Sequence, residues 1–263
     1  MTTKQKVNDL LIVEYRGAIA IISINRVAKR NALNDSLVKA IHQCFETLPE
    51  TIKVAVLSGE GEHFCAGLDL SEMRERDTGE AMYHSRMWHA AFEKIHFGRV
   101  PVIAVLRGAV VGGGLELASS THIRIAEETA FYALPEGQRG LFVGGGGSVR
   151  ISRLIGVSCM TDLMLTGRVL NAQEGHQAGA TQYLVKTGEG MQKAIELAEK
   201  ISKNAPMTNY GVMHVLPRIA DQSIQDGMIT ESLMAAVAVS DPDTKGRLAA
   251  FLDHKANKVK FKA

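Results

Sequence analysis

Nearly continuous apolar runs that end in glycine alternate along this chain with segments of helical periodicity. "IKVAVLSG" (52–59) and "VPVIAVLRG" (100–108) have the pattern of strands buried on both faces. A helical segment around residues 79–97 lies between them, and apolar residues at helical spacing also fill 34–50. Because strands and helices alternate in this way, the sequence predicts an α/β core.

The two ends of the chain differ from this pattern. "LLIVEY" and "AIAIISI" flank Arg16-Gly17 and predict a β-hairpin. From about residue 189 onward one helix is expected after another, the last with Asp241 as its cap and Pro242 at its first position. We therefore expect a core over residues 1–195 and a helical C-terminal subdomain over 196–263. The final "HKANKVKFKA" is interpreted as a solvated basic tail, with a phosphate contact as the alternative.

The composition limits the kind of partner. The 263 residues carry 30 basic and 28 acidic side chains, a net charge of +2, without a basic block, so we expect a small-molecule partner and no nucleic acid. Cys44, Cys65 and Cys159 lie far apart and lack the spacing of a metal site, so no metal is expected. No apolar run approaches the roughly 18 residues of a membrane span or forms a signal peptide, which predicts a cytoplasmic protein without a membrane partner.

Two glycine-containing turns follow predicted strands. Gly112-Gly113-Gly114 comes before "LELASS", and "HFCAGLDL" (63–70) follows the strand at 52–59. Backbone N–H groups at such turns can donate to a developing oxyanion, whereas the alternative is simple loop packing. Phosphate binding is the other common use of such turns, but neither GxGxxG nor GxxxxGK[ST] occurs here, so a Rossmann or P-loop site loses its strongest sign.

Two carboxylates lie among these glycines. Glu116 falls in the first helical turn after the triple glycine, and Glu136 follows Pro135 at the end of an apolar strand. Taken singly, Glu116 is explained as a negative charge that is favourable in the first turn of a helix, and Glu136 as an exposed acid in a loop. If the fold brings both into one apolar cavity, their pKa values separate into an acid and a base, which is suited to adding water across a double bond. Whether they meet stays open at this point.

Two further clusters contain residue types used in catalysis. The histidines of "YHSRMWHAAFEKIH" lack the HExxH spacing of a zinc site and are most simply helix histidines in contact with solvent. A possible hydrolase triad lacks the GxSxG elbow; its members would come from Ser119, Ser120, His122 and Asp69.

Five motifs together resemble a known superfamily. They are "NRVAKRNALN", "HFCAGLDLSEM", "GAVVGGGLELA", "LPEGQRGLFVGGGG" and "LTGRVLNAQEGHQAGA". In this order they are similar to the motifs of the crotonase, or enoyl-CoA hydratase/isomerase, superfamily over roughly residues 11 to 186. The resemblance implies a spiral of ββα units with a helical C-terminal trimerisation subdomain, assembled as a homotrimer or a dimer of trimers. It also implies an acyl-CoA thioester substrate and no cofactor, because coenzyme A is part of the substrate.

The resemblance also assigns roles to individual residues. The backbone amides of Leu68 and Gly113 would form an oxyanion hole for the thioester carbonyl. Glu116 would orient and deprotonate the attacking water, and Glu136, held protonated, would deliver a proton to the α-carbon. Gly144 would leave room for the water. Hydratases of this superfamily have a glutamate at both positions, so keeping both favours hydratase chemistry, whereas isomerases often keep only the one at Glu136.

The coenzyme A contacts are implied for two regions. Lys29 and Arg30 match a loop that holds the phosphates and adenine in this superfamily, and so does the backbone of Cys65, Ala66 and Leu68. Basic side chains suit phosphate binding, although for Lys29 and Arg30 a purely structural role is an open alternative.

A narrower resemblance concerns the acyl group. "LPEGQRGLFVGGGGSVRISRLIGV", "MWHAAFEKI" and "VMHVLPRIA" are similar to the methylthioacryloyl-CoA hydratases of dimethylsulfoniopropionate breakdown. In addition, Gln138 and Arg139 replace the aliphatic pair usual after the second carboxylate, which argues against a plain long-chain substrate. The alternatives are a short-chain enoyl-CoA hydratase of fatty or amino acid breakdown, an isomerase or thioester hydrolase, and a non-catalytic binding protein.

Overall fold

The computed structural model describes residues 2–72 and 75–253, and the basic segment 254–263 lies outside the described residues. The chain divides into two compact units, Met1–Ser202 and Lys203–Ala263. The boundary expected at residue 195 falls inside helix α6 (Gly190–Ile201), whereas the structural division follows this helix. Helix α6 belongs with the first unit because Ala194, Leu197 and Ala198 pack against its sheet.

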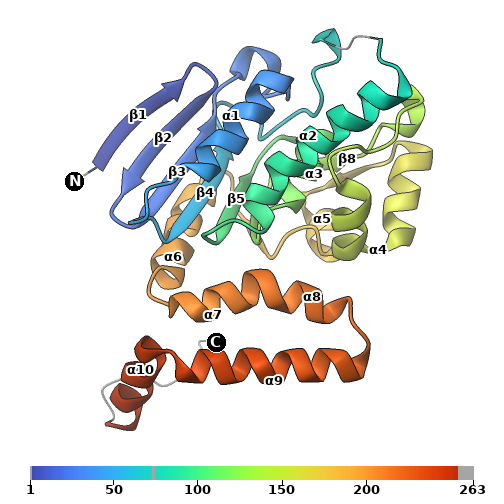
Figure 1. Ribbon diagram of the computed structural model, residues 1–263. Coiled ribbons are helices and arrows are strands. Elements are labelled where there is room, and N and C mark those ends of the chain that lie inside the picture. Colours follow the sequence, from blue (N-terminus) through green and yellow to red (C-terminus); the bar gives the residue numbers. More distant parts are fainter. Residues whose placement is uncertain (1, 73–74, 254–263) are drawn as a thin grey trace. The chain divides into compact units, whose positions relative to one another are not determined.

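A seven-stranded sheet forms the centre of the first unit (Figure 1), in the order β1-β2-β3-β4-β5-β7-β10. The first three strands are antiparallel, so the predicted hairpin is confirmed, and the pairs from β3 onward are parallel. The strands are β1 (Thr2–Asn8), β2 (Leu11–Arg16), β3 (Ile19–Ile24), β4 (Val54–Gly59), β5 (Val102–Leu106), β7 (Ile123–Glu127) and β10 (Tyr183–Val185).

Both faces of this sheet are covered by apolar side chains. Alternate residues of β3 enter different clusters: Ala20 and Ile22 belong to the larger core, whereas Ile19 and Ile21 belong to the smaller core beside α6. All residues of β3, β4 and β5 are buried. This confirms the α/β core and the strands buried on both faces that the continuous apolar runs predict.

The helices of the first unit begin and end at residues with clear local causes. The Asn34 side chain caps α1 (Asp35–Glu46) by accepting a hydrogen bond from the Leu37 N–H at 2.9 Å. Asp77 and Glu80 form a capping box at the start of α2 (Thr78–His96). The other α-helices are α3 (Gly113–Ser119), α4 (Gly147–Thr166), α5 (Ala172–Ala178) and α6, with 3₁₀ turns η1 (Val27–Lys29), η2 (Leu70–Glu72) and η3 (Gly137–Arg139).

Helix α4 is interrupted by a glycine. Gly156 has non-helical dihedral angles, φ 78° and ψ 150°, so the first helical segment ends there. The second helical segment follows directly and ends at Gly167, which has φ 70°. The two segments therefore form one kinked element.

A second sheet connects the core to the loops that carry the glycines and carboxylates. It contains β6 (Ala109–Val111), β8 (Phe131–Ala133) and β9 (Val169–Asn171) in the order β6-β8-β9. Strands β6 and β8 are parallel, with Val111 opposite Ala133. The segments that follow these two strands therefore start at the same edge of the sheet.

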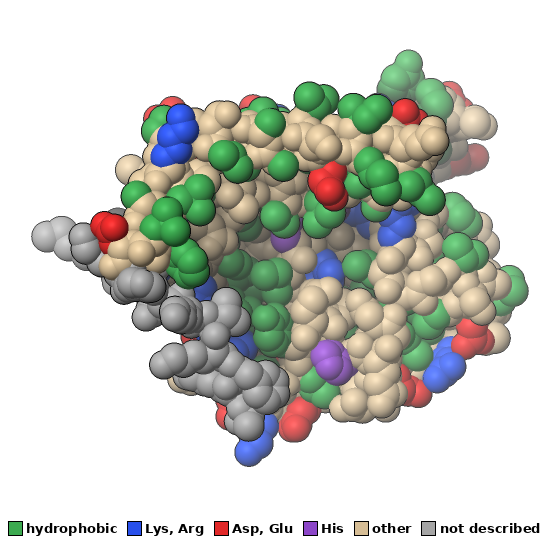
Figure 2. Space-filling model, turned by 90° about the horizontal axis from the view of Figure 1, so that it is seen from below, with side chains coloured by type: hydrophobic (Ala, Val, Ile, Leu, Met, Phe, Trp, Pro, Cys, Tyr) green, Lys and Arg blue, Asp and Glu red, His purple; other side chains and the backbone are tan. Residues whose placement is uncertain are grey.

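The second unit is helical, as predicted. It contains α7 (Pro206–Tyr210), the π-helical η4 (Gly211–Val215), α8 (Leu216–Ala220), α9 (Ile224–Ser240) and α10 (Pro242–Leu252). Asp241 caps α10 by accepting from the Asp243 N–H at 2.9 Å, with Pro242 at the first position. Figure 2 shows hydrophobic side chains exposed on the face it views. The exposed apolar side chains of α9 include Ile224, Met228, Ile229, Leu233 and Val237. Within residues 2–72 and 75–253, no helix combines the length and the apolar character that crossing a membrane requires.

Candidate active site

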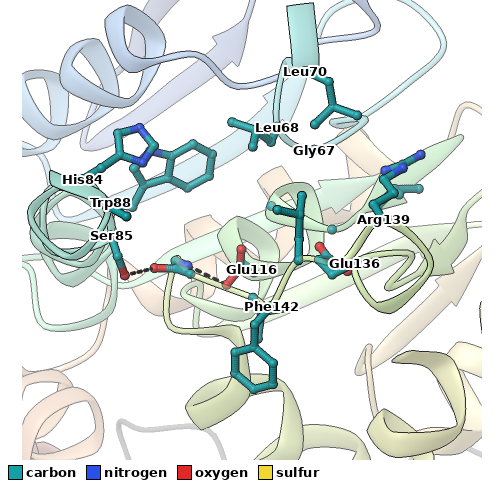
Figure 3. A pocket seen from close by; sticks show the side chains of 18 of the residues that line it. Gly67, Leu68, Leu70, His84, Ser85, Trp88, Glu116, Glu136, Arg139 and Phe142 are labelled. Atoms are coloured by element: carbon teal, nitrogen blue, oxygen red, sulfur yellow. Dashed lines mark hydrogen bonds between the residues drawn. The ribbon is translucent and has the colours of Figure 1, made fainter. Parts of the chain in front are cut away.

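One cavity of about 390 Å³ collects most of the residues that the motifs single out. The loop after β4, the start of α3, the turn after β8 and the loop before α4 all contribute to its wall, together with one face of α2. Figure 3 shows Glu116 and Glu136 on this wall, with Leu68 and Trp88 nearby. The predicted site residues that line the cavity are Ala66, Leu68, Gly113, Glu116, Glu136 and Gly144.

The parallel pairing of β6 and β8 explains why the two carboxylates meet. Because Val111 lies opposite Ala133, the turn from Gly112 to Glu116 and the turn ending at Glu136 leave the sheet side by side. The Gly112 N–H donates to the Ala133 carbonyl at 2.9 Å and continues the pairing beyond the strands. The spacing of Glu116 and Glu136 in the sequence does not reveal the pairing of β6 with β8.

Glu116 is buried and firmly held. Its side chain is 3% exposed, and Oε1 accepts hydrogen bonds from the backbone N–H groups of Gly145 at 2.7 Å and Gly147 at 2.8 Å. Gly147 is the first residue of α4, whose N-terminal cap has no side-chain hydrogen bond of its own. The carboxylate therefore serves as a remote cap for α4, where the helix dipole favours negative charge. A Cβ at Gly147 would lie 2.7 Å from Glu116 Cγ, so only glycine fits there.

Opposing effects act on the protonation of Glu116. Burial raises the pKa of its carboxyl, while the Gly147 and Gly145 amides and the Arg150 guanidinium lower it. A raised pKa makes the ionised carboxylate a stronger proton acceptor, which suits it to act as a general base.

Glu136 has a different environment. Burial is the largest cause that raises the pKa of its carboxyl, and the neighbouring Glu116 raises it further, whereas Arg139 lowers it. Its Oε2 is buried without a hydrogen-bond partner among the described residues. Oε1 lies against the Gly112 backbone, since a Cβ built at Gly112 would come within 2.6 Å of it. This environment favours a neutral acid that can donate a proton.

Two backbone amides face the region between the turns. Leu33 pairs with both neighbours of Leu68, donating to Gly67 O at 2.7 Å and accepting from Asp69 N at 2.8 Å, so the Leu68 N–H points away from Leu33. Gly113 begins α3, where an N–H has no acceptor within the helix. A Cβ at Gly67 would lie 3.4 Å from Gly113 N, so the turns are in contact. Within the described residues neither the Leu68 nor the Gly113 N–H donates a hydrogen bond, and both remain available to an oxyanion.

Gly144 lies on the cavity wall next to α2. Its carbonyl accepts a hydrogen bond from Ser85 Oγ at 2.5 Å. A Cβ at Gly144 would come no closer than 3.8 Å to Ser85 Oγ, so protein packing does not require glycine here. Keeping space for water stays the predicted reason for this residue.

The residues predicted to contact coenzyme A occupy different positions. Cys65 is fully buried and its pKa is raised to about 12 by burial, while Ala66 borders the cavity and donates to the Arg30 carbonyl at 3.0 Å. Lys29 and Arg30 are exposed and do not line the cavity, and Lys29 Nζ donates to Ser71 Oγ at 3.1 Å. The loop of Lys29 and Arg30 therefore adjoins the cavity through Ala66, and the phosphate contacts stay a prediction.

The candidate hydrolase triad is not assembled. Ser119 Oγ donates to the Glu116 carbonyl and Ser120 Oγ to the Leu117 carbonyl, both within α3 and its end. His122 Nδ1 accepts from the Val102 N–H at 3.0 Å, and Asp69 forms an ion pair with Arg26 at 2.8 Å. Across the described parts of the chain, no three His, Cys, Asp or Glu side chains gather as metal ligands do.

The sequence does not predict that Trp88 takes part in the site, and it does not distinguish the positions of Gln138 and Arg139. Trp88 packs against the backbone of Gly113 and of Gly145, because a Cβ built at these residues would lie 2.9 Å and 3.2 Å, respectively, from its ring. Gln138 does not line the cavity and instead donates to the Thr166 carbonyl at 3.2 Å, at the end of α4, whereas Arg139 borders the cavity beside Glu136 (Figure 3). Of Gln138 and Arg139, it is therefore Arg139 that lines the cavity and can contact a molecule bound there.

Comparison with known proteins agrees with this geometry. The family model described as enoyl-CoA hydratase/isomerase matches residues 14–262. The short-chain-enoyl-CoA hydratase of Clostridium acetobutylicum is 32% identical over 248 residues, which is 93% of this chain and 95% of the relative. The 2,3-dehydroadipyl-CoA hydratase of Escherichia coli is 30% identical over 251 residues, 93% of this chain and 96% of the relative.

Solved structures show the same relationship. A crystal structure from Rhodopseudomonas palustris CGA009, provisionally described as an enoyl-CoA hydratase, superposes with a TM-score of 0.92 and is 55% identical, covering 94% of this chain and 95% of the other. The fold is therefore that of the crotonase superfamily. The chain belongs to the enoyl-CoA hydratase/isomerase family of enzymes.

Proposed function

We propose that this protein is an enoyl-CoA hydratase, which adds water across the 2,3 double bond of an acyl-CoA thioester. The observation that carries the proposal is that Glu116, Glu136 and two backbone N–H groups lie on the wall of one cavity, and that neither N–H has an acceptor among the residues that the structure describes. A single carboxylate would suffice for moving a double bond, whereas water addition uses a base and an acid.

The proposed mechanism follows from these positions. The thioester carbonyl accepts hydrogen bonds from the Leu68 and Gly113 amides, which stabilise negative charge on its oxygen; losing one such donor typically costs about 2.7–4 kcal/mol of barrier. Glu116 removes a proton from water, whose oxygen bonds to the β-carbon. Glu136 gives its proton to the α-carbon as the double bond is lost.

For the acyl group we propose methylthioacryloyl-CoA. The support is the similarity of three segments of this sequence to hydratases of that substrate, and the charged Arg139 at a cavity wall where a long aliphatic chain would need apolar contacts. Water would add to the carbon that bears the methylthio group and give a hemithioacetal. Breaking the carbon–sulfur bond then releases methanethiol and leaves an aldehyde, so the atoms balance without an oxidant.

We also propose that the protein assembles as a homotrimer or a dimer of trimers. The support is the row of exposed apolar side chains on α9 in the helical unit, since large exposed apolar surfaces mark interaction sites. Sedimentation of the purified protein tests this proposal directly.

A substrate screen tests the proposed reaction. The purified protein is given crotonyl-CoA, acryloyl-CoA and methylthioacryloyl-CoA, and loss of the enoyl absorbance is followed together with free thiol and aldehyde. Thiol release from methylthioacryloyl-CoA supports the narrow substrate. Water addition without thiol release leaves a short-chain hydratase, and no turnover of any thioester would contradict the hydratase function.

A further inference from the structure

Arg150 lies behind the loop that holds Glu116 and has no role in the chemistry described above. It is half-buried in the first turn of α4, and its Nη2 donates to the Gly145 carbonyl. Its Nε lies 3.4 Å from Ser119 Oγ, which itself donates to the Glu116 carbonyl at 2.7 Å. The guanidinium therefore links the loop that binds the Glu116 side chain to the helix that carries Glu116.

The position of this cation needs a physical explanation. A positive charge in the first turn of a helix is disfavoured by the helix dipole, and partial burial disfavours it further. What offsets these costs is the negative charge of Glu116 and Glu93 and the Phe92 ring, whose centroid is 5.9 Å from the guanidinium carbon. An ionised Glu116 is thus one of the groups that stabilise the charge of Arg150.

We propose that Arg150 is a positioning residue for the hydration reaction: it fixes the loop of Gly145 and Gly147 against Glu116 and keeps the Glu116 carboxylate charged. The effect of its charge agrees in direction, because Arg150 lowers the pKa of the Glu116 carboxyl against the raising effect of burial. Without this cation, only the backbone amides of Gly147, Gly145 and Gly144 would oppose the effect of burial on the Glu116 carboxylate.

Other charged groups also face Arg150 and must be controlled. From α2 these are Glu93 and His89, and His89 in turn interacts with the exposed Arg86. Arg150 and Arg86 both lower the pKa of His89, after burial. Replacing Arg86 therefore removes a cation that lowers the pKa of His89, as replacing Arg150 does, but leaves the hydrogen bond to the Gly145 carbonyl in place.

The test compares Arg150→Met with Arg86→Met and with Arg153→Met, which removes an exposed cation one turn further along α4. The kcat/KM for the substrate found in the screen is measured from acidic to alkaline pH. We expect Arg150→Met to move the acid limb up by about one pH unit, which lowers kcat/KM by roughly tenfold at pH values on that limb and less at higher pH. Arg150→Lys, which keeps the charge, should keep the parent limb, and so should both controls.

A second measurement separates this role from the proposed function, on which it depends. Infrared difference spectra, with Glu116→Gln as the reference, follow protonation of Glu116 in protein without substrate. If protonation of Glu116 occurs at higher pH in Arg150→Met than in the parent protein, the positioning role is supported even if no thioester is turned over. Unchanged protonation of Glu116, or an activity loss that is equal at every pH in a variant with parental melting temperature, would overturn it.

Discussion

Replacing Glu116 separates its chemical role from its structural one. In Glu116→Gln the amide oxygen can still accept from the Gly145 and Gly147 N–H groups, so the start of α4 stays capped, but the proton acceptor is lost. General-base catalysis contributes about 10²–10⁴-fold, so we expect a rate loss in that range. In Glu116→Ala the chemistry is equally lost, and two buried amides also lose their acceptor.

The expected stability difference follows from those two hydrogen bonds. A buried amide without an acceptor costs about 1–3 kcal/mol, and water entering the enlarged cavity can offset part of this cost. We therefore expect Glu116→Ala to be about 2–3 kcal/mol less stable than Glu116→Gln in urea unfolding, with equally low activity in both. A Glu116→Gln variant within tenfold of the parent rate would refute the role as base, and equal stability of the two variants would refute the capping role.

Three other substitutions have distinct expected outcomes. Glu136→Gln should lose about 10²–10⁴-fold in rate, measured as enoyl absorbance loss, because the proton for the α-carbon is missing. Its stability relative to the parent should rise with pH: the raised pKa of Glu136 means that the parent loses stability as pH increases from about 4.3 through that pKa, and glutamine does not. Arg139→Met should move the alkaline limb of kcat/KM to higher pH, because Arg139 lowers the pKa of Glu136. Gly112→Ala should abolish most activity, because its Cβ would lie 2.6 Å from Glu136 Oε1 at a φ of 52°.

A control variant or a contradicting result can be stated for each of these three substitutions. Gly140→Ala also places alanine at a positive φ, 68°, but with no atom within 4 Å, so it should cost about 1–2 kcal/mol in unfolding while keeping activity. If Gly112→Ala is as active as Gly140→Ala, the close contact with Glu136 is wrong. An alkaline limb that does not move in Arg139→Met, or a pH-independent stability difference for Glu136→Gln, would contradict the environment described for Glu136.

Much of the fold is predictable because local patterns determine it. The apolar runs at 52–59 and 100–108 become β4 and β5, and Asn34 and Asp241 cap helices where short polar residues before apolar periodic segments predict caps. Strand β1 has no comparable signal: "TTKQKVN" is polar and pairs with β2 along one edge of the sheet. Backbone pairing at such an edge needs no apolar alternation, so the sequence does not reveal it.

The site is less accessible to sequence reasoning because it depends on contacts between distant segments. Glu116 and Glu136 meet only through the pairing of β6 with β8, and Arg150 donates to the Gly145 carbonyl of the glycine loop, whose N–H groups bind Glu116. Gln138 is next to Arg139 in the chain but bonds to the end of α4. The motifs indicate which residues are candidates for the site, whereas the packing of distant segments determines which of them line the same cavity.

The most direct test of the two-carboxylate hydration is the product formed in heavy water. The parent protein is incubated with crotonyl-CoA in D₂O and the product is analysed by NMR. We expect 3-hydroxybutyryl-CoA with one deuterium on the α-carbon in a single configuration, because Glu136 delivers an exchanged proton from one side while Glu116 directs the water. A shifted double bond without added oxygen, hydrolysis to crotonate and free coenzyme A alone, or unchanged substrate would contradict it.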